Sequence, residues 1–324
     1  MLLDERPYSR DVAKLRWSYM EHWSVPSARG PSTQYASVHE MDKFVKQLAA
    51  VGFTGLDIFD FHVHALTEMF GSLERYGHFL NERGLEKVVG VFHAPTYLES
   101  RFGAPHIRES HDALLANCER IMQSVEPLRV ETFVVMPAAS YPYVEPVTDE
   151  KIAIMGEFWN RVGEMTLRYG VKTAAHHEFW CGIRSVDEIE KFYAATDPRY
   201  VYFCVDTAQH VIAGVDPVAL YRRYADRCCA FHFKDTHDVD PGDEYRTLPD
   251  AELAAGAVKR WFWEMGTPEG LVDWEGVMQA LADTGYEGWV TVEHDKADIG
   301  GGSYSESTSV AMWYQQRVLS RIYA

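Results

Sequence analysis

The sequence predicts a (β/α)8 TIM barrel, an α/β fold, as a single domain. Short apolar segments of strand length alternate with amphipathic helical segments along all 324 residues. No change in composition and no Pro/Gly-rich linker separates the two halves, so one domain over 1–324 is expected. A doubly wound sheet is the alternative, but the chain has no G-x-G-x-x-G turn to support it.

In chain order, the strands are predicted where apolar and β-branched residues run without interruption, as in strands buried on both faces. These segments are 15–21, 55–61, 87–93, 130–136, 171–177, 201–206, 230–234 and 289–293. Apolar residues at helical spacing predict helices between them. These helices cover 38–50, 64–83, a stretch ending near 125, 149–169, stretches starting after Ser185 and Asp216, 274–284, and a last helix through 322.

Two helix starts have a chemical signature. Ser185 and Glu188 form a capping box, and Pro217 follows Asp216 at the first helical position. Long loops follow the third and fourth strands, at 94–106 and 137–146, and the first of these suggests substrate contact. One insertion is expected at about 236–273, near the barrel mouth, and its aromatic stretch 260–263 is predicted to fold back onto that mouth.

Composition limits the function classes. The formal net charge of −17, without a Lys/Arg cluster, argues against nucleic-acid binding. No apolar run approaches the roughly 20 residues that a membrane span requires, and the charged N-terminal stretch is unlike a signal peptide, so a cytoplasmic protein is expected. The five cysteines include no CxxC pair, which indicates packed, reduced thiols.

Four strands end on residues that can bind a metal ion. If the barrel closes, Glu178, Asp206, His232 and Glu293 lie at neighbouring carboxyl ends of strands five to eight. Three carboxylates so close together repel one another, and a divalent cation removes that cost. The donor set suggests Mn²⁺, with Mg²⁺, Co²⁺ or Zn²⁺ as alternatives.

The ligand on the fifth strand is left open by the sequence. His176 and Glu178 are two residues apart, so both face the barrel interior. Glu178 is preferred as the ligand because it lies nearer the mouth, and His176 is then free as a base or as a partner that orients a ligand. Lys234 shares the inward face with His232 and is a candidate to neutralise an oxyanion or to hold a carboxylate ligand.

Other polar and aromatic residues are weaker candidates for the same cavity. They are His62, His64 and His93 at strand ends, Trp17, Trp23, Trp180, Trp261 and Trp263 as stacking surfaces, and the glycines at 300–302, for which a loop is preferred over a phosphate site.

Three segments carry a resemblance to a known family. The stretches 204–217 (CVDTAQHVIAGVDP), 231–235 (FHFKD) and 285–295 (GYEGWVTVEHD) resemble the sugar phosphate isomerase/epimerase superfamily of xylose-isomerase-like TIM barrels. That superfamily includes ketose 3-epimerases, inosose dehydratases and endonuclease IV. The resemblance spans nearly the whole chain.

The resemblance implies roles for individual residues. It implies that Glu178, Asp206, His232 and Glu293 hold the metal, and that the carboxylates Glu178 and Glu293 act as acid and base. One departure affects substrate binding, because Gln209 stands where relatives commonly have a histidine.

The leading functional hypothesis is therefore a metal-dependent enzyme that removes a proton next to a carbonyl of a sugar or cyclitol, through an enediolate. Reprotonation gives an isomerase or epimerase, and loss of a β-substituent gives a lyase. The aromatic insertion favours a bulky substrate, as in the α subunits of C-glycoside deglycosidases, which act on 3-oxo-glycosides with a small β subunit; an oligomer is expected. The alternatives are an endonuclease IV-like phosphodiester hydrolase and a sugar-binding barrel without activity.

Overall fold

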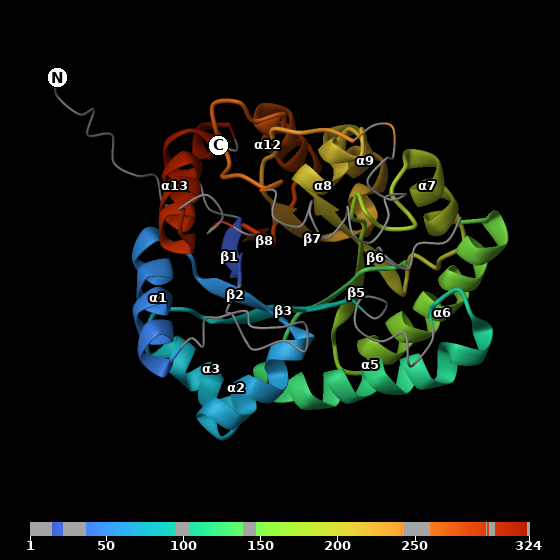
Figure 1. The fold of residues 1–324 in the computed structure, drawn as a ribbon, viewed down its shortest axis with the longest axis horizontal. Coiled ribbons are helices and arrows are strands. Elements are labelled where there is room, and N and C mark those ends of the chain that lie inside the picture. The colour runs from blue at the N-terminus through green and yellow to red at the C-terminus, as the bar shows by residue number, and fades with distance from the viewer. Residues whose placement is uncertain are drawn as a thin grey trace.

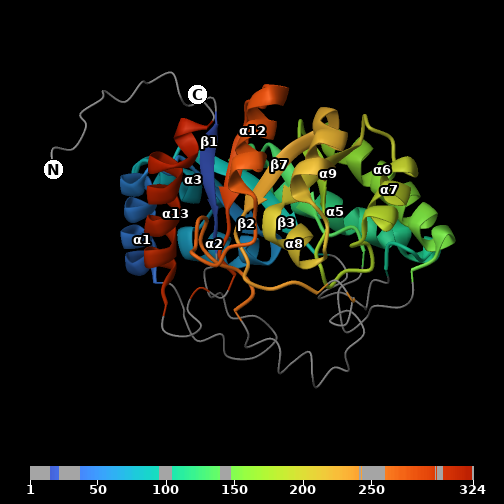
Figure 2. The same ribbon diagram turned by 90° about the horizontal axis from the view of Figure 1, so that it is seen from above.

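The computed structural model describes residues 15–21, 37–94, 104–138, 147–240, 242, 260–295, 297 and 302–322. Eight parallel strands form a closed barrel in chain order, and β8 pairs with β1 to close it (Figure 1). Helices surround this barrel on its outer side, as both ribbon views show (Figures 1 and 2). The predicted single-domain (β/α)8 barrel is confirmed.

The strands match the predicted segments closely. They are β1 (Arg16–Met20), β2 (Gly55–Phe59), β3 (Lys87–His93), β4 (Thr132–Val135), β5 (Lys172–His176), β6 (Val201–Asp206), β7 (Cys228–Phe233) and β8 (Trp289–Val292). β3 and β6 have the predicted bounds, and the others differ by one or two residues at an end. The pattern of uninterrupted apolar runs is therefore a reliable guide to these strands.

The helices also follow the predicted order. They are α1 (Val38–Val51), α2 (Val63–Phe70), α3 (Leu73–Asn81), α5 (His111–Val125), α6 (Asp149–Leu167), α7 (Val186–Ala194), α8 (Thr207–Ile212), α9 (Pro217–Tyr224), α12 (Trp274–Thr284) and α13 (Tyr304–Arg317). Ser185 and Glu188 cap the start of α7 reciprocally, and the Asp216 side chain caps α9. Both predicted helix starts are confirmed.

Two local predictions are wrong. The stretch 64–83 is two helices, because Gly71 takes a left-handed conformation with φ of 80° and Ser72 caps a new helix. The second strand ends at Phe59, since Asp60–His62 forms a 3-10 helix. The short helix α8 was not expected; the Asp206 side chain caps it by accepting a hydrogen bond from the Gln209 N–H.

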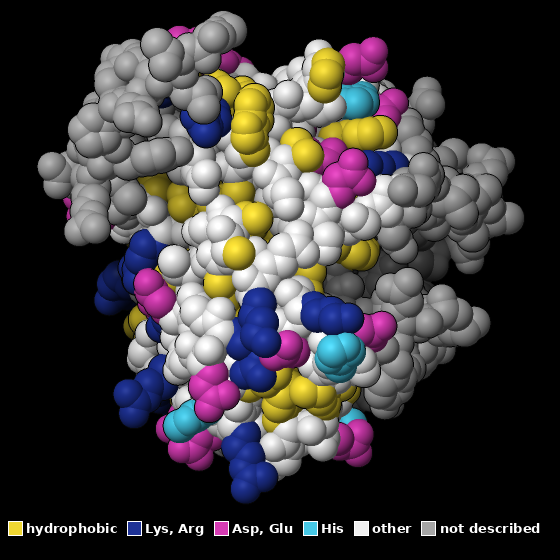
Figure 3. Space-filling view, turned by 90° about the vertical axis from the view of Figure 1, so that its left-hand side faces the viewer, with side chains coloured by type: hydrophobic (Ala, Val, Ile, Leu, Met, Phe, Trp, Pro, Cys, Tyr) yellow, Lys and Arg dark blue, Asp and Glu magenta, His cyan; other side chains and the backbone are white. Residues whose placement is uncertain are grey.

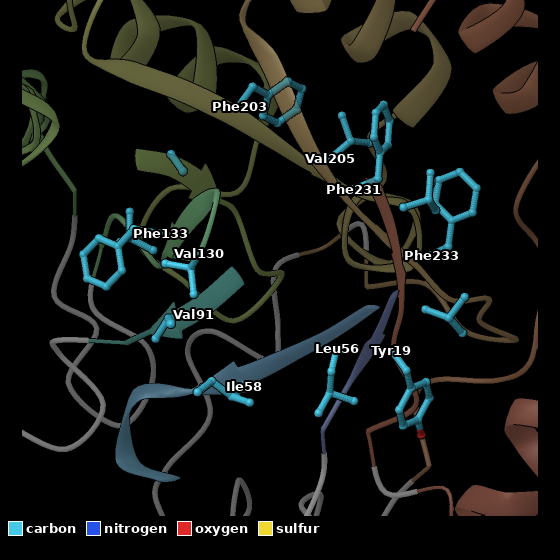
Figure 4. Packing of buried hydrophobic residues seen from close by; sticks show 14 of the residues in the cluster. Tyr19, Leu56, Ile58, Val91, Val130, Phe133, Phe203, Val205, Phe231 and Phe233 are labelled. Carbon is cyan, nitrogen blue, oxygen red and sulfur yellow. The ribbon is translucent and has the colours of Figure 1, made fainter. Parts of the chain in front are cut away.

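Side chains alternate between the barrel interior and the helix layer along each strand. The interior cluster consists of Met20, Phe92, Val134, Ala174, Cys204 and Ala230. The outward side chains, such as Phe133, Phe203 and Phe231, belong to the large core between strands and helices, and Figure 4 shows them pointing away from the ring of strands. This alternation decides which polar residues can reach the interior.

The outer surface carries charges of both signs. On the face in Figure 3, basic and acidic side chains are interspersed, with hydrophobic side chains in small groups between them. α1 and α13 lie side by side in both ribbon views (Figures 1 and 2). Among the described residues, no helix is both long enough and apolar enough to cross a bilayer.

Candidate active site

Three strands end on side chains that point into the barrel. His176, Asp206 and His232 each stand two residues beyond a member of the interior cluster, and so share its inward face. Asp206 and His232 are also register partners across β6 and β7. Glu293 follows β8 directly, and its N–H bonds to the Phe233 carbonyl at 3.2 Å, which continues the ladder beyond the strand. The four side chains therefore meet at the carboxyl ends of β5 to β8.

The four side chains form one compact donor set. His176 Nε2 lies 3.0 Å from Asp206 Oδ2, and His232 Nδ1 lies 3.0 Å from Glu293 Oε2. Each of the four offers one ligand atom, all within 4.8 Å of one another, and all four residues are buried. Within the part of the chain that the structure describes, this is the one group of His, Cys, Asp and Glu side chains gathered so tightly.

The set contains His176 where the sequence analysis preferred Glu178. The Glu178 carboxylate lies just outside it, with Oε1 at 3.6 Å from His176 Nδ1, and it also accepts a hydrogen bond from Trp180 Nε1. Burial raises the pKa of Glu178 to about 8, although the nearby Lys234 ammonium lowers it. Near neutral pH this carboxyl can therefore both take and give a proton.

Lys234 supplies a positive charge inside the cluster. Its side chain is 1% exposed. Its Nζ lies 2.8 Å from Asp206 Oδ2 and 3.3 Å from Asp295 Oδ2, and it also contacts Glu293 Oε2. Burial lowers the pKa of Lys234, but the three carboxylates raise it well above its usual value, so the amine is charged.

Two members of the set, Asp206 and His176, have protonation states that suit metal binding, whereas burial lowers the pKa of His232 but the Glu293 carboxylate raises it above its ordinary value. Burial raises the pKa of Asp206, but the charge of Lys234 and the hydrogen bond from His176 lower it to about 2, so this carboxylate is ionised. Burial lowers the pKa of His176, which favours a neutral ring with a lone pair for a ligand. Two imidazoles and two carboxylates are a donor set that fits Zn²⁺, Mn²⁺ or Co²⁺. The residues therefore fit a divalent cation.

Aromatic residues border the site on the side of the insertion. Trp263 forms an antiparallel bridge with Asp235, with both N–H···O distances at 2.8 Å, so the stretch 260–263 returns to the end of β7. Phe262 lies over Lys234, with Nζ 4.6 Å from the ring centroid, and Trp261 packs against Phe179 at 4.9 Å between ring centroids.

Several weaker candidates lie elsewhere. His64 is on the surface, with a side chain 85% exposed, beside Glu68. His93 points outward, stacks on Phe133 and pairs with Asp60 at 2.7 Å. Trp17 belongs to the outer core, next to Phe233. The interpretation that His64 and His93 face the cavity is wrong, because His64 is on the surface and strand alternation places His93 on the outer face. Trp17, a weaker candidate as a stacking surface, takes a core position instead.

The remaining candidates divide between the mouth and the undescribed residues. His62 is buried against the rings of Phe59 and Phe61 after β2. Gln209 accepts a hydrogen bond from the Phe179 N–H at 3.0 Å, so it holds the loop after β5. Trp23 lies outside the described residues, as do the first two glycines of 300–302.

Two acidic residues near the site were not singled out in the sequence. Asp295 contacts Lys234, and its position two residues beyond Glu293 was the available signal. Asp235 anchors the end of the insertion, because its carboxylate accepts hydrogen bonds from three backbone N–H groups and from Trp274 Nε1.

Comparison with known proteins shows what the chain resembles. The model of the family described as xylose isomerase-like TIM barrel matches residues 45–312. Inosose dehydratase of Lacticaseibacillus casei is 28% identical over 149 residues, which are 46% of this chain and 49% of that protein. The chain thus spans about half the length of the curated relatives it matches.

Solved structures share the fold over nearly the full length. A sugar phosphate isomerase/epimerase from Parabacteroides distasonis superposes with a TM-score of 0.70 at 18% identity, covering 98% of this chain and 99% of that one. IolI protein with a bound zinc atom gives a TM-score of 0.68 at 15% identity, covering 95% and 99%.

Proposed function

The chain belongs to the xylose isomerase-like TIM barrel family, and from that premise we propose that it is a metal-dependent enzyme acting on a sugar or cyclitol. The reaction is removal of a proton from the carbon next to a carbonyl group. The observation that carries the proposal is the convergence of His176, Asp206, His232 and Glu293, with Lys234 and Glu178 beside them.

The metal ligands in this proposal are His176, Asp206, His232 and Glu293. Their geometry favours the fifth-strand alternative that the sequence analysis ranked second, because Glu178 lies outside the compact set. Mn²⁺ remains the first expectation. A set of two imidazoles and two carboxylates suits Zn²⁺ better than the set of one imidazole and three carboxylates that the sequence analysis preferred. The IolI protein, which has a similar fold, was solved with a bound zinc atom.

A bound divalent cation would polarise the carbonyl group and make the adjacent C–H more acidic. Glu178 is the candidate to take that proton, because its carboxylate lies beside the donor set, with Oε1 3.6 Å from His176 Nδ1. Lys234 stabilises the negative charge that develops on the substrate oxygen. Glu293 is the candidate to return a proton in an epimerase reaction. The sequence analysis had already assigned it, with Glu178, to proton transfer.

The substrate class follows from the relatives and from the mouth. Similarity to inosose dehydratases supports a β-eliminating lyase that acts on a cyclitol, and a neighbouring isomerase/epimerase fold supports reprotonation as the other branch. The half-buried Trp180, which donates a hydrogen bond from Nε1 to Glu178, favours a bulky substrate, such as a 3-oxo-glycoside. In that case the chain serves, in the cytoplasm, as a C-glycoside deglycosidase α subunit, in an oligomer with a small β subunit.

Deuterium exchange tests the reaction. The Mn²⁺-loaded protein is incubated in D₂O with ketoses, inososes and 3-oxo-glycosides in turn, and NMR follows the carbon next to the carbonyl. Exchange without loss of a group identifies the epimerase branch, and exchange with elimination identifies the lyase branch. Absence of exchange with all three classes, by a fully loaded protein, contradicts the proposed function.

Two variants test the ligand assignment. His176→Ala should lose the metal, whereas Glu178→Gln should keep it and lose most of its turnover, by roughly 100-fold or more. Elemental analysis of both purified proteins measures the metal content. A Glu178→Gln protein without metal, beside a fully loaded His176→Ala protein, would reverse the assignment.

A further inference from the structure

Lys234 contacts carboxylate oxygens of two members of the donor set. Its Nζ lies 2.8 Å from Asp206 Oδ2 and also contacts Glu293 Oε2. Those oxygens lie 3.0 Å from His176 Nε2 and from His232 Nδ1, respectively. The ammonium therefore stands where two carboxylates and two imidazoles converge.

An ammonium and a divalent cation cannot both occupy that position. They carry charge of the same sign, and at contact distance in a buried site their repulsion is large. Once a metal is bound, each of the two oxygens can keep a weaker hydrogen bond to a displaced lysine. Neither oxygen can keep its present close contact with Nζ and bind the metal at the same time. Binding of a cation therefore requires Lys234 Nζ to move.

Among the residues that the structure describes, Asp295 offers a destination within reach of Lys234 Nζ. Asp295 Oδ2 is 3.3 Å from Nζ, and the Asp295 side chain is 27% exposed, against 5% for Glu293 and none for Asp206. Phe262 presents its ring face to the same ammonium at 4.6 Å, which stabilises a charged Nζ near this ring. Movement toward Asp295 is movement toward solvent, with a carboxylate to receive the charge.

We propose that Lys234 is a built-in counter-cation that stabilises the metal-free site and transfers to Asp295 when a divalent cation is loaded. Asp295 is then a positioning residue, since it acts on the reaction through Lys234. The inference rests on the proposed metal site. Its consequence is that the lysine charge faces the mouth, ready for a substrate oxyanion, only in the loaded protein.

Metal binding to chelator-treated protein tests this inference. Calorimetric titration with Mn²⁺ compares the wild type with Lys234→Met, Asp295→Asn and the double variant, and melting curves are recorded without metal. Lys234→Met should bind Mn²⁺ at least about 10-fold more tightly and melt at a lower temperature when metal-free. Asp295→Asn should bind about 3-fold to 10-fold more weakly.

The double variant shows whether Asp295 affects metal affinity through Lys234 or only through its own negative charge. If Asp295 acts by receiving Lys234, Asp295→Asn should have little effect in the Lys234→Met background. An undiminished effect there, or unchanged affinity in Lys234→Met, overturns the inference. Lys191→Met removes a surface lysine that pairs with Asp149 and Asp187, and it should leave affinity unchanged.

Two further outcomes are distinguishable. If Lys234→Met folds only when metal is present, the inference is supported, because the metal-free variant has no cation beside its buried carboxylates. In that case the titration is repeated with Lys234→Gln. A wild-type protein that binds no divalent cation contradicts the proposed function itself. A wild-type protein that binds Mn²⁺ while Lys234→Met and Lys234→Gln bind no more tightly contradicts only the role of Lys234.

Discussion

Gly90 on β3 marks a place in the barrel interior that has no room for a side chain. A Cβ added there would lie 2.4 Å from Asp57 Oδ1 and 2.5 Å from Thr132 Oγ1. Asp57 is buried and also accepts a hydrogen bond from Thr291 Oγ1 at 3.1 Å, so it cannot simply turn away. The glycine is therefore required by the polar residues around it.

Gly90→Ala should destabilise the protein by about 1–3 kcal/mol, because the new methyl group overpacks the interior. Urea unfolding measures the change in the free energy of unfolding. Gly77→Ala on α3 is the matched control, since a Cβ there meets its nearest neighbour at an ordinary 3.6 Å and alanine favours helix. A loss of stability as large at Gly77 as at Gly90 would show that crowding is not the cause.

His93 makes stability depend on pH. Burial lowers the pKa of His93, but Asp60, by charge and hydrogen bond, and to a lesser extent Cys118 raise it, to about 10. A free histidine has a pKa of about 6.5, so the folded protein binds the proton more tightly than the unfolded chain. The stabilisation is complete below about pH 6.5 and is lost as pH rises toward 10.

His93→Gln should therefore flatten the fall in the free energy of unfolding between pH 7 and 10. The slope that one such group contributes is at most about 1.4 kcal/mol per pH unit. Denaturant unfolding at a series of pH values measures it. His64→Gln, at an exposed position, should keep the wild-type slope; equal slopes in wild type and His93→Gln would count against the pairing with Asp60.

At this scale the sequence predicted that side chains from strands five to eight meet, but not which of two neighbours on the fifth strand joins the compact donor set. Alternation along the strand places His176 and Glu178 on one face and cannot rank them. The ranking depends on how far each lies from Asp206 and His232, which follows from the barrel register. The outward positions of His93 and Trp17 follow instead from alternation along β3 and β1.

At the scale of elements, Gly71 divides one predicted helix into two. Its φ of 80° reverses the chain direction between α2 and α3, and Ser72 caps α3 by accepting a hydrogen bond from the Arg75 N–H at 3.2 Å. Apolar spacing continues across this break, so periodicity alone did not reveal it. The Gly-Ser pair was the available signal.

Gly71→Ala should cost about 1 kcal/mol, because a left-handed conformation is unfavourable for a residue with a Cβ. Gly71→Asn should cost less, since asparagine tolerates that region better. Thermal unfolding of the two variants measures the difference. Equal losses would indicate that space beside Arg75, rather than the backbone, is limiting, as a Cβ would lie 3.2 Å from its Nη1.

The strands and most helices were predictable because each carries its own signal. β3 and β6 are uninterrupted apolar runs, and α7 begins at a capping box. The short helix α8 lacks such a signal, since its start depends on Asp206, a residue that also serves the site. Elements whose residues serve two purposes are the ones that local patterns miss.

At the scale of the whole molecule, metal binding should raise resistance to heat. A ligand that binds only the folded state stabilises it, by about 4 kcal/mol at a concentration 1,000 times its Kd. Chelator treatment should therefore lower the Tm by several degrees and abolish turnover, and added Mn²⁺ should restore both. Calorimetry with Asp206→Asn as control should show no response to either treatment.

The bridge between Asp235 and Trp263 holds the start of the insertion and a point within it together beside β7. The four hydrogen bonds that the Asp235 carboxylate accepts tie that point to the start of α12. Lengthening a loop with clamped ends costs little, about 0.6 kcal/mol for each doubling. Inserting or deleting residues between these two clamped positions should therefore leave the barrel and its donor set as they are.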